Sequence, residues 1–265
     1  MAITDAQRRM AVRDHNRKLR LEAQFRPQLR RFHRRLARSY ARELARDGTI
    51  FDFETETQDD LRELLLVHYV RVGELFTRTI DAQLKQISIV VSEHYKIKSV
   101  EQARAITTTT RRHAEEALAA ARLAATVAGL AGEIVMTALE IATAASGIFN
   151  RKLAGREDSL LMFETNLSAE AAKLTQVELL AGEEPSIAGG SSRPSKMTKS
   201  WANLGDSRVR RSPFNHLFAE QTVPANRPFV VSGERLRYPG DTSLGASLGN
   251  VIRCRCSAIY GRAAA

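Results

Sequence analysis

The apolar residues between positions 25 and 44 recur at steps of three and four. They are Phe25, Leu29, Phe32, Leu36, Tyr40 and Leu44. This spacing places them on one face of an α-helix whose other positions are rich in arginine. Pro27 fits the first turn of this helix, or a kink between two helices, because proline lacks the N–H that an interior position donates. Asp47-Gly48-Thr49 then predicts a turn.

The next two helix starts are predicted from capping signals. Thr55 and Gln58 have the spacing of a capping box, so we expect a second helix from there through Phe76. Ser99 and Gln102 repeat the spacing and predict a further helix start.

An alanine-rich stretch predicts a long helix from residue 111 to about residue 145, ending near Ser146-Gly147. A bilayer span needs about 20 predominantly apolar residues. Because Arg122, Glu133 and Glu140 interrupt the stretch, we expect it to pack in a helix bundle and expect no membrane contact. A last helix is predicted over residues 168–180.

The pattern changes after this helix. Glycine, serine and proline crowd together before two short apolar runs, Phe229–Val231 and Leu236–Tyr238, whose connection at 232–234 predicts a β-hairpin. Residues 251–258 then alternate, which predicts a final strand with Ile252, Cys254, Cys256 and Ala258 on one face.

These elements predict an α+β protein with a mostly helical amino-terminal part and a small carboxyl-terminal module that contains a hairpin and a final strand. We expect a basic helical segment at 1–46, a helical domain at 47–183, a linker or long loop at 184–198 and the module at 199–265.

Charge adds a candidate contact surface. The 265 residues are 43% hydrophobic, enough to form a core, and carry a net charge of +10. Residues 1–46 hold fourteen basic and four acidic residues and so account for all of it. Such a helix fits an acidic protein surface or the phosphates of nucleic acid, bound without sequence specificity because no base-reading motif accompanies it. The candidate contact residues are Arg13, Arg17, Lys18, Arg20, Arg30, Arg31, Arg34, Arg35, Arg38 and Arg42.

The two cysteines, Cys254 and Cys256, leave several interpretations open. Two cysteines make no disulfide framework, and the start of the chain is charged, so we expect folding in a reducing cytoplasm. Burial as small apolar side chains is the favoured interpretation. Zinc binding with His216 is an alternative, in which water, Asp206 or Asp241 completes four ligands. A cysteine nucleophile with His216 as base is a third.

Six short motifs follow one another between residues 199 and 260. They are Lys199-Ser200-Trp201, Asp206 with Arg208-Val209-Arg210, Gln221-Thr222-Val223-Pro224, Pro228-Phe229 with Gly233 and Leu236, Tyr238-Pro239-Gly240-Asp241, and Asn250-Val251-Ile252 with Cys254-Arg255-Cys256. Together they resemble the Mu F-like phage head morphogenesis family, the minor head proteins of tailed bacteriophages. The likeness covers the last quarter of the chain, and residues 163–183 are similar to the helix that precedes the module. The chain departs from the family at Arg253, where an asparagine is usual.

The resemblance implies a non-enzymatic protein without a cofactor, made in the bacterial host cytoplasm and placed in the virion, in the capsid interior near the portal vertex. Its expected partners are the portal protein, around which several copies gather, other head proteins and packaged DNA. Its expected role is in procapsid assembly and in DNA packaging or delivery. Two alternatives remain: a nonspecific DNA-binding protein that organises the genome, and a zinc-dependent hydrolase or nuclease that uses His216, Cys254 and Cys256.

Overall fold

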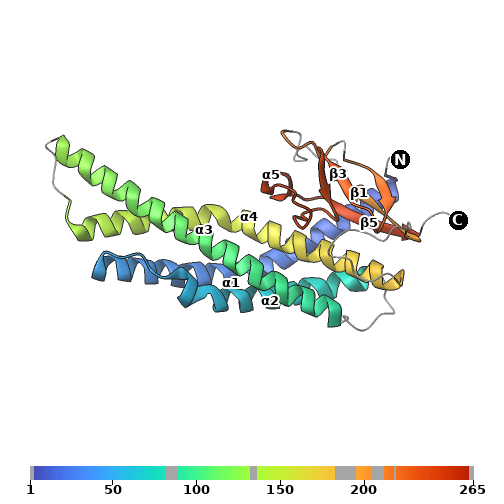
Figure 1. The fold of residues 1–265 in the computed structure, drawn as a ribbon, viewed down its shortest axis with the longest axis horizontal. Helices are drawn as coiled ribbons and strands as arrows, with labels where there is room; N and C mark the ends of the chain where they lie inside the picture. Colours follow the sequence, from blue (N-terminus) through green and yellow to red (C-terminus); the bar gives the residue numbers. More distant parts are fainter. Residues whose placement is uncertain are drawn as a thin grey trace. The chain divides into compact units, whose positions relative to one another are not determined.

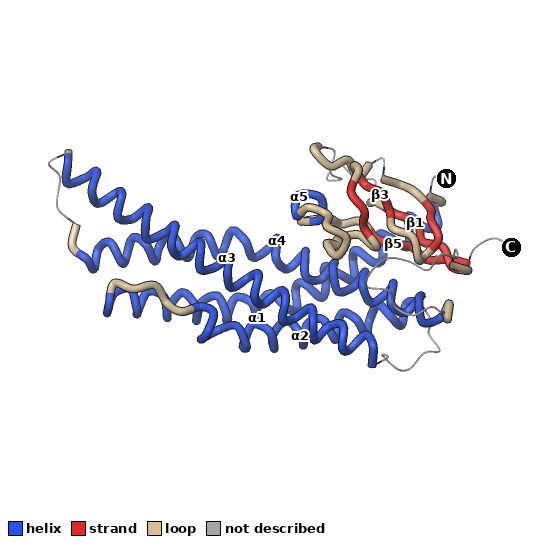
Figure 2. Tube along the Cα trace, viewed as in Figure 1, coloured by secondary structure: helices blue, strands red, loops and turns tan. Residues whose placement is uncertain are grey.

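The computed structural model describes residues 3–80, 89–131, 136–182, 195–204, 212–217 and 219–262. Long helices come first, and short strands follow with one short helix (Figures 1 and 2), which confirms the α+β class. The elements are α1 (Asp5–Asp47), α2 (Phe53–Ile80), α3 (Ile89–Leu130), α4 (Ala138–Leu180), β1 (Met197–Ala202), β2 (Thr222–Pro224), β3 (Phe229–Val231), β4 (Glu234–Leu236), α5 (Leu248–Val251) and β5 (Ser257–Arg262).

Helix α1 agrees with the predicted helical segment at 1–46 to within four residues at its start, whereas α2 starts before its predicted cap. Helix α1 begins at a capping box in which the Thr4 N–H donates to Gln7 Oε1 at 2.8 Å and the Gln7 N–H donates to Thr4 Oγ1 at 3.2 Å. Helix α2 begins at Phe53, because Asp52 Oδ1 caps it by accepting from the backbone N–H groups of Glu54 and Thr55. The predicted start at Thr55 therefore lies two residues too late. Pro27 lies in the interior of α1, neither at a first turn nor between two helices.

Helices α3 and α4 correct three further predictions. Ser99 lies within α3, where its hydroxyl donates to the Lys96 carbonyl at 2.8 Å instead of capping a helix. Helix α3 ends at Leu130, and α4 starts at a second capping box, formed by Thr137 and Glu140. Helix α4 then continues without a break to Leu180, so neither the predicted end near residue 146 nor the separate helix at 168–180 exists. Glu133 lies outside the described residues.

The chain divides into two compact units, and each of the four long helices contributes one portion to each unit. The first unit comprises residues 1–24, 68–95 and 159–265, and the second unit comprises residues 25–67 and 96–158. The predicted domains follow the order of the chain, whereas these units are built from separate stretches. Most of the predicted linker, residues 184–194, lies outside the described residues, and residues 197–198 already belong to β1.

The first unit contains an antiparallel sheet of strand order β2-β1-β5 and a separate β3-β4 hairpin. Trp201 on β1 pairs with Ala258 on β5 and is fully buried, with its ring edge-on to Phe229 at 5.2 Å between centroids. Ser232 and Gly233 both have positive φ, 52° and 83°, as a tight two-residue hairpin turn requires. The hairpin prediction is confirmed, with its second strand starting two residues earlier than predicted.

The predicted strand over residues 251–258 was wrong over residues 251–256. Residues 248–251 form α5, and β5 starts at Ser257, so both cysteines lie in the connection between them. Arg253 has a φ of 56°, which is incompatible with an extended chain and is the conformation that asparagine adopts more readily than arginine. Burial of Cys254 and Cys256, each 4% exposed, is confirmed.

The second unit has an aromatic core. All six periodic residues of segment 25–44 are buried, as predicted. Tyr40 packs against Phe149 and Phe53 at ring centroid distances of 4.6 and 6.2 Å, and its hydroxyl donates to the Ala114 carbonyl at 3.1 Å. No helix in the described part of the chain has the length and hydropathy needed to cross a bilayer.

Candidate functional site

The strongest candidate site is a buried cluster of His216, Cys254 and Cys256 in the first unit. His216 lies in the connection between β1 and β2, and the cysteines lie between α5 and β5. His216 Nδ1 is 3.6 Å from Cys254 Sγ and 3.7 Å from Cys256 Sγ. The three side chains are 2%, 4% and 4% exposed. The structure thus brings together the three residues that the sequence nominated as metal ligands.

Asn250 fixes the orientation of the imidazole ring. Its Nδ2 donates to the Val231 carbonyl at 3.1 Å and to Glu234 Oε2 at 2.8 Å, so its Oδ1 faces His216 Nε2 at 2.7 Å. An amide oxygen only accepts hydrogen bonds, and Nε2 therefore carries the proton. The lone pair of Nδ1 then points toward the two sulfurs. Asn250 was not among the predicted site residues, although it stands in one of the six motifs.

The pKa values of the two thiols are shifted in opposite directions. A hydrogen bond from Cys256 lowers the pKa of Cys254 well below its usual value, and the His216 ring adds to this effect against the opposing influence of burial. The same hydrogen bond, together with burial, raises the pKa of Cys256 well above its usual value. The cluster therefore combines two sulfurs and one imidazole nitrogen, and this donor set can hold a soft or borderline metal ion.

Asp241 is not a further ligand of this cluster. Its Oδ2 accepts from the Arg237 N–H at 2.7 Å and its Oδ1 accepts from the Ser243 N–H at 2.9 Å, so the carboxylate holds the turn after β4. Asp206 lies outside the described residues. Within the described ranges, only His216, Cys254 and Cys256 form a group of potential ligands with this proximity, all within 4.8 Å of one another.

Most of the predicted basic contact residues lie at the surface. Arg17 is half-buried near Asp14, with 3.7 Å between charged atoms. Two exposed members form ion pairs, Arg30 with Glu157 at 2.7 Å and Arg35 with Asp60 at 2.9 Å. The exposed members are Arg13, Arg20, Arg30, Arg31, Arg34, Arg35, Arg38 and Arg42.

Lys18 corrects this assignment, because it is buried. Its Nζ donates to Glu170 Oε1 at 2.6 Å, to Asn166 Oδ1 at 2.7 Å and to Ser257 Oγ at 3.1 Å. Only 2% of the residue is exposed, so it has no surface from which to contact DNA or a partner. Sequence reasoning missed this role because Lys18 stands in a run of basic residues and its partners lie far away in the chain.

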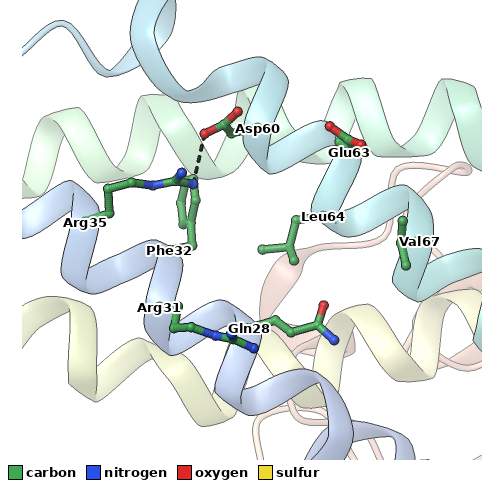
Figure 3. Close-up of a pocket in the computed structure, with 8 residues that line it drawn as sticks. All are labelled: Gln28, Arg31, Phe32, Arg35, Asp60, Glu63, Leu64 and Val67. Carbon is green, nitrogen blue, oxygen red and sulfur yellow. Dashed lines mark ion pairs between the residues drawn. The ribbon is translucent and has the colours of Figure 1, made fainter.

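A hollow in the second unit lies between α1 and α2 beside two of the exposed arginines (Figure 3). It has a volume of about 560 Å³. Arg31 and Arg35 line it from α1, and Asp60 and Glu63 line it from α2; the dashed line in Figure 3 marks the Arg35–Asp60 ion pair. With charges of both signs on its walls, the hollow does not select a polyanion.

No family model, curated protein or solved structure matches the chain.

Proposed function

We propose that this chain is a non-enzymatic minor head protein of a tailed bacteriophage, which binds the portal protein and acts in procapsid assembly and in DNA packaging or delivery. The observation that carries the proposal is that motifs far apart in the sequence lie together in the first unit. Five of the six motifs lie in described parts of the first unit, and the motif at 206–210 lies outside the described residues. Four of the five contribute residues to one apolar core, and the fifth contributes Tyr238 to a second cluster; Phe163 and Tyr260 pack against both.

The contacts within this core link motif to motif. Trp201, Phe229 and Leu236, from three different elements, pack in one apolar cluster with both cysteines. The Gln221 side chain exchanges hydrogen bonds with the Val230 backbone, donating at 2.9 Å and accepting at 3.2 Å, and so joins the segment before β2 to β3. A run of motifs that fold together supports a resemblance to a family module better than separate matches do.

A stripe of arginines on α1 supports a contact with an acidic partner surface. Arg34, Arg38 and Arg42 are spaced by four residues, which places them along one side of the helix. All three are exposed, and none has a carboxylate ion-pair partner in the part of the chain that the structure describes. Free guanidinium groups in a row suit a negatively charged surface, because no internal carboxylate competes for them.

Co-purification with the phage portal protein tests the proposal. We would compare the wild-type chain with the variant Arg34→Gln/Arg38→Gln/Arg42→Gln in nuclease-treated extract at moderate and high salt. Arg104→Gln/Arg111→Gln/Arg112→Gln, on exposed positions of α3, is the matched control for net charge. We expect the wild-type chain and the control to be retained with the portal and the stripe variant to be lost. Substitution is preferable to deletion of residues 1–46, because that segment supplies buried residues such as Ala11 and Leu21.

Nonspecific DNA binding is the second candidate, and the same arginine stripe favours it. It predicts that the wild-type chain binds duplex DNA of any sequence with an affinity that falls steeply as salt rises, and that the stripe variant binds more weakly. Absence of the chain from virions and procapsids, combined with DNA binding, would favour this candidate over the head protein. The hydrolase alternative has less support, because a substrate has little access to side chains only 2–4% exposed.

A further inference from the structure

We propose that His216, Cys254 and Cys256 bind one zinc ion, which fastens the segment before β5 to the connection between β1 and β2. This inference does not rest on the proposed function, since it concerns only the buried groups of the first unit.

The distances fit a tetrahedral ion. At Zn–S and Zn–N bond lengths of about 2.3 Å and 2.0–2.1 Å, tetrahedral zinc places sulfur and nitrogen ligands about 3.5–3.6 Å apart. The two sulfur-to-Nδ1 distances are 3.6 and 3.7 Å. The imidazole nitrogen therefore lies at a suitable separation from each sulfur for one shared ion, and all three ligand atoms lie within 4.8 Å of one another.

The surroundings prepare His216 as a ligand. Metal-bound histidines commonly donate their second N–H to an oxygen that fixes the ring. Here the Asn250 amide is that acceptor, and it is itself held by the Val231 carbonyl and the Glu234 carboxylate. Trp201 stands edge-on to the imidazole, with 5.6 Å between ring centroids and an interplanar angle of 88°, and limits rotation of the ring.

The donor set selects the metal. Two cysteine sulfurs and an imidazole suit zinc, whereas calcium and magnesium require oxygen ligands. The described residues supply three of the four ligands that a tetrahedral zinc ion takes. Because the cluster is buried and joins segments from separate parts of the chain, the bound ion would act as a cross-link that stabilises the fold.

Metal analysis of the purified full chain tests this proposal. We expect one zinc per chain by mass spectrometry of the metal content. Replacement by Co²⁺ should produce the intense near-ultraviolet absorption of thiolate-to-cobalt charge transfer. Cys256→Ser should lose this absorption and the zinc, while His113→Gln, which changes a histidine of the second unit, should keep both. Less than stoichiometric zinc in folded wild-type protein, together with no charge-transfer absorption on adding Co²⁺, would overturn the proposal; this measurement needs no variant to fold.

Asn250 provides a sharper test of the same site. We expect Asn250→Ala to weaken zinc binding about 10- to 100-fold in competition with a chromophoric chelator, since second-sphere partners of metal ligands typically contribute this much. Asn250→Asp keeps an oxygen acceptor opposite Nε2 and should retain more of the affinity. Equal affinities in wild type and both variants would contradict the role assigned to Asn250.

Discussion

Two lysines are buried in different regions of the first unit, and their surroundings differ in kind. Lys173 and Lys199 are each 1% exposed. The Lys173 ammonium contacts Glu170 Oε1 at 2.8 Å and Asp14 Oδ2 at 3.0 Å. Both ammonium groups also donate to a backbone carbonyl, Lys173 to that of Ala258 at 2.9 Å and Lys199 to that of Arg237 at 2.6 Å. Lys199 Nζ, in contrast, lies 5.0 Å from the centre of the Phe229 ring and forms no ion pair with a carboxylate of the described residues.

The difference teaches that partners, and not burial alone, decide whether a buried amine is charged. Burial by itself would lower the pKa of Lys173, but the charges of Asp14 and Glu170 raise it above its ordinary value. Burial lowers the pKa of Lys199 to about 7, and the charge of Arg237 adds to the effect. Near neutral pH, Lys173 is therefore an ion within a charged network, whereas Lys199 titrates.

Replacing Glu170, the carboxylate that Lys18 and Lys173 share, should have the largest effect on the free energy of unfolding. Glu170 is fully buried; its Oε1 accepts from both Lys18 and Lys173, and its Oε2 accepts from the Ala258 N–H at 2.9 Å. Glu170→Gln leaves two buried ammonium groups short of a carboxylate, and we expect a loss of about 3–5 kcal/mol in the free energy of unfolding. Urea unfolding followed by far-ultraviolet circular dichroism measures it.

The control for this variant is an exposed ion pair. Glu115→Gln removes the pair of Glu115 with Arg111, whose side chains are 49% and 53% exposed. Exposed pairs contribute about 0–1 kcal/mol, so this variant should unfold almost like the wild type. Similar losses in the two variants would show that the buried network is no more important than a surface pair.

Lys199→Met should change how stability depends on pH. A folded-state pKa of about 7, below the ordinary lysine value of 10.5, means that the folded protein binds this proton less tightly than the unfolded chain does. The resulting destabilisation is complete below pH 7 and is relieved as pH rises from 7 toward 10.5. Between pH 6 and pH 9 the wild type should gain about 3 kcal/mol from this group.

Unfolding free energies measured across this pH range test the prediction. Lys199→Met should be more stable than the wild type at pH 6 and should lose more than half of that advantage by pH 9. Lys196→Met, an exposed lysine in the same stretch of chain, should keep the wild-type slope. The explanation is wrong if the Lys199→Met slope equals the wild-type slope.

Sequence reasoning located helices better than their ends. The periodic apolar face of segment 25–44 was predicted because each residue of the pattern is local. Capping-box spacing misled at Thr55 and Ser99, while the boxes that cap α1 and α4 start at Thr4 and Thr137. Spacing shows which side chains could cap, but whether a helix continues past them depends on packing against distant segments.

The ligands of the candidate site could be predicted from the sequence, but the residue that orients His216 could not. Histidine and cysteine are common metal ligands, so His216 could be grouped with the two cysteines from the sequence alone. The role of Asn250 depends on a carbonyl of the hairpin, and the burial of Lys18 depends on Glu170, 152 positions away. Neither contact produces a periodic pattern in the sequence, because each joins residues that are brought together only by the tertiary fold.

The smallest predicted loss of stability concerns the turn at residues 238–241, which lies between the charged network around Lys173 and the surroundings of Lys199. Asn166 Oδ1 accepts from Lys18 in the charged network, while its Nδ2 donates to the Pro239 carbonyl at 3.0 Å, close to the turn that Asp241 holds. Gly240 follows with a φ of 95°, and a Cβ added there would lie 2.9 Å from Asn166 Nδ2. An alanine at this position is strained and also displaces Asn166.

Gly240→Ala should therefore lower the free energy of unfolding by about 2 kcal/mol, from the positive φ and from the disturbed Asn166. Gly245→Ala is the matched control, because Gly245 has a φ of 84° but nothing within 4 Å of an added Cβ. It should show the backbone strain alone, about 1 kcal/mol. Adding Asn166→Ala should remove most of the difference between the two glycine variants, since the displaced side chain is then absent. A Gly240→Ala loss no larger than that of Gly245→Ala would mean that the turn and the charged network are energetically independent.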